Sequence, residues 1–199
     1  MTRREEMNRL EKQKEAIDNL SDDIGITHEV VEAEIIIEEV PILVIEEPKI
    51  RLNLGCGYRK EGEDWINIDI REEVNPDVIA DIEQGLSYQD NSVDEIRAFD
   101  VLEHIHPDKV IFVLSEIHRV LKSTGFLYFF IPSTDGRGWA QDPFHRSFWN
   151  INSWLYYVNA DWHGLYPGLP FFKAEFIRDV CPNEQLRIIH TEGKIFPVK

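Results

Sequence analysis

The sequence has few cysteines, few basic residues and no long hydrophobic run. Its 199 residues include only two cysteines, Cys56 and Cys181, which argues against a disulfide-stapled scaffold and favours a reducing, cytoplasmic compartment. The longest apolar runs, PILVI and FLYFFIP, are far too short to span a bilayer, and the N-terminus lacks the apolar core of a signal peptide. We therefore expect a cytoplasmic protein with no membrane partner.

Basic residues are outnumbered, because 21 Lys and Arg stand against 37 Asp and Glu, for a formal net charge of −16. No run of Lys or Arg is long enough to form the basic stripe that neutralises a phosphate backbone. Nucleic acid is therefore disfavoured as a partner, and a small-molecule substrate is expected. The charge is uneven, since residues 1–48 hold fourteen acidic and five basic residues. This division predicts an acidic N-terminal extension over 1–48 and a domain over 49–199.

The N-terminal extension carries two patterns. Four apolar residues are spaced 7, 3 and 4 apart and share one helical stripe: Leu10, Ile17, Leu20 and Ile24. This stripe predicts a short helix that either docks on its own domain or a second copy, or remains a solvated arm. From 29 to 47 the chain is β-branched and acidic and is divided by Pro41, which predicts two short edge strands or an extended arm.

Beyond Pro48 short apolar stretches alternate with Gly, Asp and Pro. We predict seven strands: 50–54, 65–70, 77–82, 95–100, 126–131, 186–190 and 194–198. The segment HPDKVIFVLSEIHRVLKS between the fourth and fifth has apolar residues recurring at intervals of 3 and 4, which predicts a helix with one buried face. A strand, a helix and a further strand in this order predict an open, mostly parallel α/β sheet.

The sharpest local motif is LNLGCG, in which a strand runs into Gly55, Cys56 and Gly57. Glycines at the carboxyl end of a first strand let the backbone turn tightly and approach a ligand closely. An ordinary strand-end turn explains the pair equally well. A phosphate loop requires Gly-Lys-Ser/Thr, which is absent, and the dinucleotide fingerprint requires a third glycine where Lys60 stands.

Three further predicted strands end in a carboxylate. Asp69 lies twelve residues after Gly57, where it can accept both hydroxyls of a ribose. Asp81 can accept from an adenine amino group, and Asp100 ends the fourth strand. Each is also explicable as a turn cap or as ordinary surface polarity. Together with the glycine pair they predict a ligand crevice at the carboxyl edge of the sheet.

The ordered series LNLGCG, INIDI, VIADI, DNSVDEIRAFDVLEHI and SEIHRVLKSTGFLYFFIP resembles the class I, Rossmann-like S-adenosylmethionine-dependent methyltransferases, especially the compact type 11 group. The resemblance covers about residues 50–133. It implies a seven-stranded sheet of order 3-2-1-4-5-7-6 with an antiparallel last strand, for which LRIIH and KIFPV look like the final hairpin. It also implies S-adenosylmethionine as cofactor and S-adenosylhomocysteine as product.

The same resemblance assigns the cofactor-binding residues. Gly55, Cys56 and Gly57 would line the methionine and ribose portion, and Asp69 with the adjacent Ile70 would hold the ribose. Asp81 with Ile82 would face the adenine. Asp100 would sit near the methionine amino group.

The chain departs from the family pattern in two respects. Tyr58 and Arg59 follow Gly57 in place of a third glycine, and Thr124-Gly125 replaces a Gly-Gly pair, so cofactor affinity is affected. The connections 58–64 and 71–76 are shorter than a parallel crossover normally requires. Either the strands are misplaced, or one sheet face has reduced helices. In the second case residues 1–48 or a second subunit would cover that face, giving a possible homodimer through the extension or the helix-poor face.

The segment between Ser133 and Leu186 holds twelve of the 22 aromatic residues. They form either the second half of the core or a substrate-recognition region. Its Asp-Pro-Phe-His-Arg stretch resembles a motif of some related enzymes. We take His104 and His145 as catalytic candidates, with Asp142 orienting His145, although a structural role explains each of them as well.

Three histidines could suggest a metal site: His104, His106 and His118. No acidic or cysteine partner completes a credible ligand spacing with them, so no metal is expected.

The predicted function is methyl transfer from S-adenosylmethionine to a small-molecule or glycan-like acceptor. The alternative is a non-catalytic module that keeps the methyltransferase fold for binding or assembly, which the short crossovers and the acidic extension favour. Methylation of nucleic acid or protein would require a basic surface or a peptide groove, and the sequence indicates neither.

Overall fold

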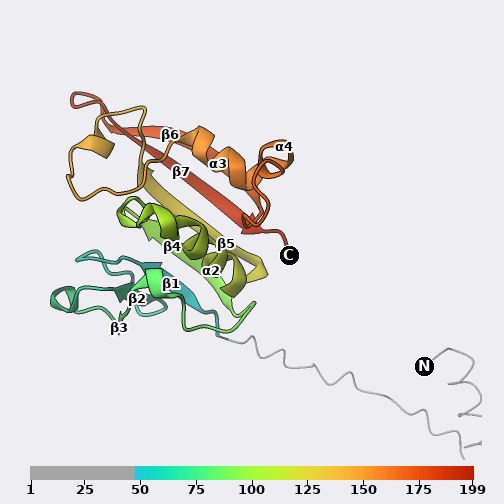
Figure 1. The fold of residues 1–199 in the computed structure, drawn as a ribbon. Coiled ribbons are helices and arrows are strands. Elements are labelled where there is room, and N and C mark those ends of the chain that lie inside the picture. The colour runs from blue at the N-terminus through green and yellow to red at the C-terminus, as the bar shows by residue number, and fades with distance from the viewer. Residues whose placement is uncertain (1–47) are drawn as a thin grey trace, which may run out of the picture. The chain divides into compact units, whose positions relative to one another are not determined.

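A computed structural model of the protein describes residues 48–199, which form a seven-stranded mixed sheet (Figure 1). The strands are β1 (Arg51–Leu54), β2 (Ile66–Asp69), β3 (Val78–Ile79), β4 (Val93–Phe99), β5 (Leu121–Pro132), β6 (Phe172–Asn183) and β7 (Ile188–Pro197). The α-helices are α2 (Val110–Val120), α3 (Ile151–Val158) and α4 (Ala160–His163). The expected N-terminal helix and arm, and any cover that residues 1–48 give the sheet, lie outside the described residues.

Five 3₁₀ turns complete the described elements: η1 (Glu72–Val74), η2 (Ile82–Gln84), η3 (Leu102–His104), η4 (Pro107–Lys109) and η5 (Gly138–Ala140). Within residues 48–199 no helix has the length and apolar character that a membrane span requires. Most of the 3₁₀ turns lie in the connections that follow strands, where they shape the loops of the site.

The strand order is β3-β2-β1-β4-β5-β7-β6, as predicted. β1 pairs in parallel with both β2 and β4, and β4 pairs in parallel with β5. β7 runs antiparallel to both of its neighbours, β5 and β6. In register, Leu54 lies opposite Ile68 on β2 and opposite Ala98 on β4. The carboxyl ends of these three parallel strands are therefore level, which brings the residues that follow them to one edge.

The final hairpin was predicted wrongly. The two expected strands, 186–190 and 194–198, lie almost entirely within the single strand β7, and the partner is β6, which begins inside the aromatic segment. Gly193 interrupts the apolar pattern of β7, but it is needed there because a Cβ would collide with the Phe129 ring on β5. β6 lies at the sheet edge and buries only its first residue, Phe172, so its segment did not show the apolar stretch of a core strand.

The short crossovers are real, and the strands around them are correctly placed. The β1–β2 connection holds no α-helix, and the β2–β3 connection holds only η1. In Figure 1 α2 and α3 both lie in front of the sheet. The reduced helices on one face are thus confirmed for the described residues.

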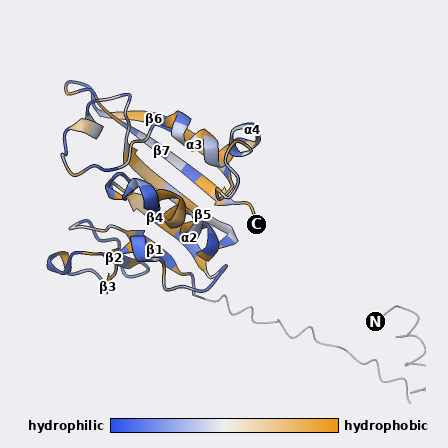
Figure 2. Ribbon diagram, viewed as in Figure 1, coloured by the Kyte–Doolittle hydropathy of each residue, from blue (hydrophilic) through white to orange (hydrophobic). Residues whose placement is uncertain are grey.

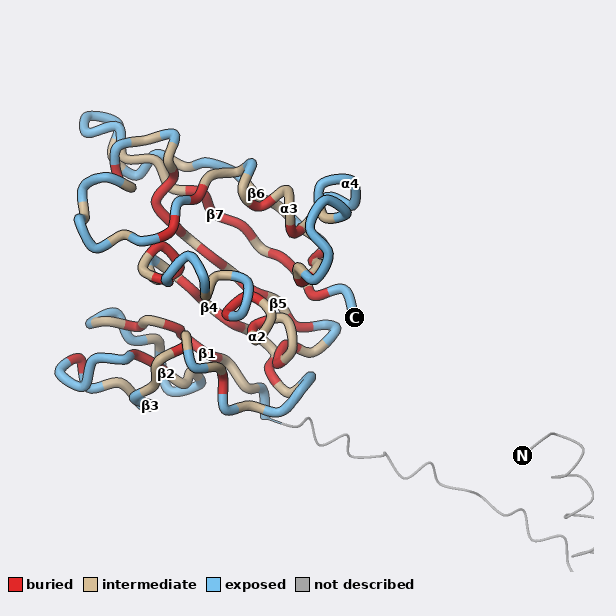
Figure 3. The backbone as a smooth tube through the Cα atoms, in the orientation of Figure 1, coloured by how far each residue is buried: buried red, intermediate tan, exposed pale blue. Residues whose placement is uncertain are grey.

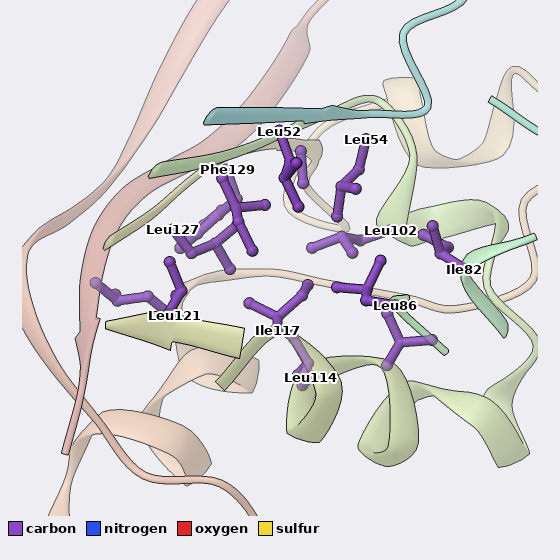
Figure 4. Close-up of a cluster of buried hydrophobic side chains, with 14 of the residues drawn as sticks. Leu52, Leu54, Ile82, Leu86, Leu102, Leu114, Ile117, Leu121, Leu127 and Phe129 are labelled. Carbon is purple, nitrogen blue, oxygen red and sulfur yellow. The ribbon is translucent and has the colours of Figure 1, made fainter. Parts of the chain in front are cut away.

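The helix-covered face holds the core. Predicted helix α2 buries Val113, Leu114, Ile117 and Val120, and Leu114 and Ile117 belong to the same buried cluster as strand residues Leu52, Leu127 and Phe129 (Figure 4). Figure 3 shows that buried residues follow the central strands, and Figure 2 shows hydrophobic residues concentrated on β5 and α2. Burying each such side chain contributes about 1.5–3 kcal/mol, so this layer fixes the frame that carries the strand ends.

The opposite face is covered by its own long side chains. The Arg97 guanidinium lies over the Trp65 ring, 4.5 Å from its centroid, and Lys194 Nζ lies 4.5 Å from the Phe126 centroid. Phe99 contacts Tyr128 edge to face, with centroids 5.0 Å apart. Cation–π contacts and aliphatic stems therefore shield the sheet where helices are missing among the described residues.

Candidate functional site

A cavity of about 600 Å³ opens at the carboxyl ends of β1, β2 and β4. Most of the predicted site residues line it: Gly55, Asp69, Ile70, Asp81, Ile82, Asp100, His104 and Asp142. Cys56, Gly57 and His145 do not line it. The lining residues that sequence reasoning missed include Arg71 and Val101, whereas Phe144 and Arg146 belong to the Asp-Pro-Phe-His-Arg stretch noted in the sequence. The predicted convergence of the strand ends on one pocket is therefore present in the structure.

The glycine turn shapes one wall of the cavity. Gly55 and Gly57 have φ of 61° and 51°, a left-handed conformation that favours glycine. A Cβ on Gly55 would also overlap the Val101 side chain. The buried Cys56 donates its backbone N–H to the Ile68 carbonyl (3.0 Å), and burial raises the pKa of its thiol. Cys56 and Gly57 therefore do not line the cavity, but their backbone hydrogen bonds hold the turn that forms its wall.

Asp69 is the most firmly held acid of the cavity. It is 4% exposed, and its Oδ2 accepts the Gly57 N–H at 2.8 Å. Its Oδ1 accepts the Arg71 backbone N–H (3.0 Å) and the Arg71 Nε (3.1 Å). Burial alone would raise the pKa of Asp69, but these hydrogen bonds outweigh it and hold the pKa below its ordinary value. The carboxylate is thus charged and oriented.

The other two strand-end acids have local partners as well. Asp81 caps η2, since its Oδ1 accepts the Glu83 N–H at 2.9 Å, so the turn-cap explanation holds alongside its place on the cavity wall. Asp100 has φ of 50°, and its Oδ1 lies 3.1 Å from His190 Nε2. Two carboxylates besides Asp69 thus face a pocket that Ile70 and Ile82 line with apolar surface.

The second wall comes from the loop that follows β5. The backbone N–H groups of Arg146 and Ser147 both donate to the Glu103 carbonyl, at 2.7 and 3.0 Å. The Ser147 hydroxyl donates to the Leu102 carbonyl (2.8 Å) and accepts from Trp149 Nε1 (2.8 Å). These bonds fasten the loop onto η3. His145 consequently meets His104 edge to face, with ring centroids 4.9 Å apart.

The backbone, and not Asp142, orients His145. Its Nδ1 lies 2.8 Å from the Trp139 carbonyl, which can only accept, so Nδ1 carries the hydrogen. The Asp142 carboxylate instead accepts the Phe144 N–H at 2.8 Å. The His145 side chain is 8% exposed and its Nε2 lies 3.9 Å from Glu103 Oε1.

Burial is the main cause that lowers the pKa of His104, and the neighbouring His145 adds to it. The Phe144 backbone and the carboxylates of Asp142 and Asp100 act in the opposite direction. His104 is therefore neutral at pH 7 and has a lone pair at the cavity wall.

Glu103 is a buried acid that sequence reasoning did not select. It is 2% exposed, and its Oε2 has no hydrogen-bond partner. Burial raises its pKa to about 8, and the nearby Asp100 and Asp142 act in the same direction. The available signal was a single acid between Leu102 and Ile105, which are both buried.

The aromatic segment contributes both to the core and to cavity walls. Trp149, Trp154, Tyr157 and Phe172 are buried, and Trp154 stacks on Phe129 with centroids 3.7 Å apart. Other members line cavities: Phe144 faces the first, while Phe148, Tyr156 and Tyr166 face a second of about 550 Å³. Arg146 lines both cavities and so stands between them.

The sequence matches one family model, described as a methyltransferase domain, over residues 52–129. Comparison with curated proteins gave no significant match. Many solved structures share the fold. An S-adenosylmethionine-dependent methyltransferase from Methanosarcina mazei is 15% identical, with a TM-score of 0.55 over 76% of this chain and 94% of the other.

Two further solved structures with the same fold contain a bound form of the cofactor. The 1,6-didemethyltoxoflavin-N1-methyltransferase of Burkholderia thailandensis, with its acceptor and S-adenosylhomocysteine bound, is 17% identical (TM-score 0.52; 77% of this chain, 72% of that chain). A variant 16S rRNA (adenine(1408)-N(1))-methyltransferase of Catenulisporales acidiphilia, with its cosubstrate, is 14% identical (TM-score 0.52; 76% and 85%). Residues 52–129 are thus similar to a methyltransferase domain, and the described chain shares the Rossmann-like fold of these methyltransferases.

Proposed function

We propose that the protein transfers a methyl group from S-adenosylmethionine to a small-molecule or glycan-like acceptor. One observation carries the proposal: the glycine turn at Gly55 and the carboxylates of Asp69, Asp81 and Asp100 line a single cavity at the carboxyl edge of the sheet. Open α/β folds bind ligands at this edge.

The residues present suit the cofactor. The buried Asp69 carboxylate is charged and can accept the two ribose hydroxyls, while Asp81 lies beside the apolar Ile82 where an adenine ring fits. The acidic lining also suits the positive charge of a sulfonium and an amino group. Bound there, S-adenosylmethionine supplies an electrophilic methyl group on sulfur.

Arg71 affects cofactor affinity. Its guanidinium donates hydrogen bonds to the Asp69 carboxylate, from Nη2 to Oδ2 (3.4 Å) as well as from Nε to Oδ1. Ribose hydroxyls must replace these bonds or share the carboxylate with them. This competition, together with the missing third glycine, supports moderate rather than tight cofactor binding.

The second wall is the proposed acceptor side. Phe144, Arg146, Asp142 and His104 line it, so it offers an aromatic face, a positive charge and a neutral imidazole. Such a set orients a polar molecule and can take a proton from it. The Burkholderia enzyme acts on a small molecule and the Catenulisporales enzyme on rRNA. The net charge of −16 favours a small acceptor for this chain.

Titration calorimetry with S-adenosylhomocysteine tests the cofactor site. Binding by the wild type, weakened by Asp69→Asn, supports the proposal, and a folded protein without affinity for either cofactor form would overturn it. Release of S-adenosylhomocysteine in the presence of a panel of sugars and small alcohols then tests turnover. Binding without turnover across the panel would favour the non-catalytic module, which the helix-poor sheet face also favours.

A further inference from the structure

Three side chains gather beside the cavity although the sequence separates them. One ligand atom from each of Glu103, His104 and His145 lies within 4.8 Å of the other two. The two hydrogen bonds from the 146–147 backbone to the Glu103 carbonyl hold them together, so the grouping is built into the loop anchoring. This set differs from the three histidines His104, His106 and His118, because it shares only His104 with them.

The free lone pair of His145 Nε2 lies toward the Glu103 carboxyl group. His145 commits its Nδ1 hydrogen to the Trp139 carbonyl and leaves Nε2 as an acceptor that points at Glu103. A hydrogen bond from the second ring nitrogen to a backbone carbonyl is the usual support of a metal-binding histidine. The 3.9 Å between Nε2 and Glu103 Oε1 is too long for a direct hydrogen bond. Two ligands on one Zn²⁺ at about 2.0–2.2 Å lie roughly 3–4 Å apart, so this gap suits an intervening ion.

The surroundings of Glu103 give an independent indication that a ligand binds here. Its carboxyl group is 2% exposed and its Oε2 meets no donor, an arrangement that destabilises the fold when nothing binds the oxygen. Asp100 and Asp142 act electrostatically on the same group, so the surroundings are acidic. No cationic side chain pairs with Glu103 among the described residues, since its one close partner is His145.

We propose that Glu103, His104 and His145 bind one divalent transition-metal ion, with Zn²⁺ as the ion that suits the donor set, and that its open position faces the cavity. Two imidazoles and a carboxylate form a three-ligand set typical of catalytic zinc, whereas Mg²⁺ prefers oxygen ligands. His104 is the ligand that lines the cavity and so directs the open position there.

The substrate class follows from this site and rests on the proposed function. The open position takes an acceptor hydroxyl, which loses its proton to solvent more readily because a bound cation stabilises the resulting anion. With the ion bound, His104 serves as a ligand and solvent replaces it as the base. The protein would accordingly methylate oxygen rather than carbon. Arg146, which also lines the cavity, is placed to hold a further anionic or polar group of the acceptor.

The metal site is tested by calorimetry with Zn²⁺ on metal-stripped protein and by the visible absorption of Co²⁺ added in its place. We expect about one equivalent of Zn²⁺, little Mg²⁺ binding, and the intense Co²⁺ bands of a low-coordinate site. Glu103→Gln and His145→Gln should each weaken Zn²⁺ binding at least 100-fold. His106→Asn, on the exposed N-cap of η4, is the matched control and should bind like the wild type.

If a buried variant does not fold, His104→Gln at the cavity wall replaces it, and the Co²⁺ spectrum of the wild type needs no variant. Zn²⁺ binding that is absent, or unchanged in all three variants, overturns the site. S-adenosylhomocysteine binding is measured on the same samples. Zn²⁺ binding without cofactor binding would leave the metal site standing and the methyltransferase proposal refuted, and the reverse result would do the opposite.

Discussion

The two sides of the cavity are built by different means. On the side proposed to hold the methyl donor, called the donor side, Gly55, Asp69 and Asp100 lie at the carboxyl ends of adjacent parallel strands, so the sheet alone brings them together. On the acceptor side, Glu103 and His145 meet only because the loop after β5 is fastened to η3. The donor side is thus a property of the fold, and the acceptor side is a property of one loop in this chain. Substitutions should affect the two sides separately.

The largest expected effect is on the donor side, in Gly55→Ala. The left-handed backbone and the overlap with Val101 should together lower the free energy of unfolding by about 2–4 kcal/mol. Urea denaturation measures the change. Gly62→Ala in the same connection is the control, because a Cβ there meets nothing within 4 Å. Equal loss in both variants would contradict the strain argument, and Val101→Ala should partly restore Gly55→Ala.

Asp69→Asn should weaken binding on the donor side and leave binding on the acceptor side unchanged. Loss of a charged acceptor costs about 1.5–3 kcal/mol, so affinity for S-adenosylhomocysteine should fall roughly 10- to 100-fold. Zn²⁺ affinity should change less than twofold, because Asp69 is not among the three proposed ligands. Calorimetry with both ligands checks this, and a parallel fall in Zn²⁺ affinity would show that the two sides are coupled.

Ser147→Ala should loosen the acceptor side alone. It removes a buried hydroxyl that serves the Leu102 carbonyl and Trp149 Nε1, which should cost about 1–3 kcal/mol of stability. Zn²⁺ affinity should fall more than cofactor affinity. Ser92→Ala, whose hydroxyl bonds the Gln89 carbonyl at an exposed turn, is the matched control and should leave both affinities unchanged.

Glu103→Leu should stabilise the metal-free protein by about 1 kcal/mol. The substitution replaces a buried carboxyl that has an unpaired oxygen with an apolar side chain of similar size. Thermal unfolding in chelator measures the gain, and Glu103→Gln should gain less because it keeps polar atoms. Destabilisation by Glu103→Leu in chelator would indicate that the carboxyl already has a stabilising partner.

The smallest expected effect is a loss of folding stability at low pH. Because the folded-state pKa of Asp69 lies below its unfolded value of about 3.9, the charged group stabilises the fold above that pH, and the contribution is lost as the pH falls through the folded pKa. The difference in unfolding free energy between wild type and Asp69→Asn should therefore shrink below about pH 4. Denaturation curves at pH 3 and pH 7 test this, and a constant difference would contradict it.

Sequence patterns predicted that the strand ends would line one cavity, because the residues at these ends obey local rules. Each lies at the end of an apolar stretch, and parallel topology brings such ends to one edge. Helix α2 was equally readable, since Leu114 and Ile117 repeat at helical spacing and both are buried. The crossovers that lack helices were also visible in the sequence, as distances too short for a helix.

The acceptor side and the last strands were not predictable in the same way. Glu103 meets His145 through backbone hydrogen bonds, which leave no trace in side-chain patterns. The predicted gap between the strands 186–190 and 194–198 contains Gly193, and this is the residue whose missing side chain lets the continuous β7 pass the Phe129 ring. Edge strand β6 pairs on one side only and buries only Phe172, so no apolar stretch marked it. In each case a contact distant in sequence overrode the local signal.

The two margins of the sheet avoid strand addition by opposite devices. At one margin β3 is only two residues long and offers almost no free backbone groups. At the other, β6 spans twelve residues but carries Lys173, Glu175, Arg178 and Asp179, and its register shifts at two points. Alternating charges and bulges disfavour the docking of a foreign strand. Neither margin therefore provides a template for fibril growth, although a sheet of this size could have exposed one.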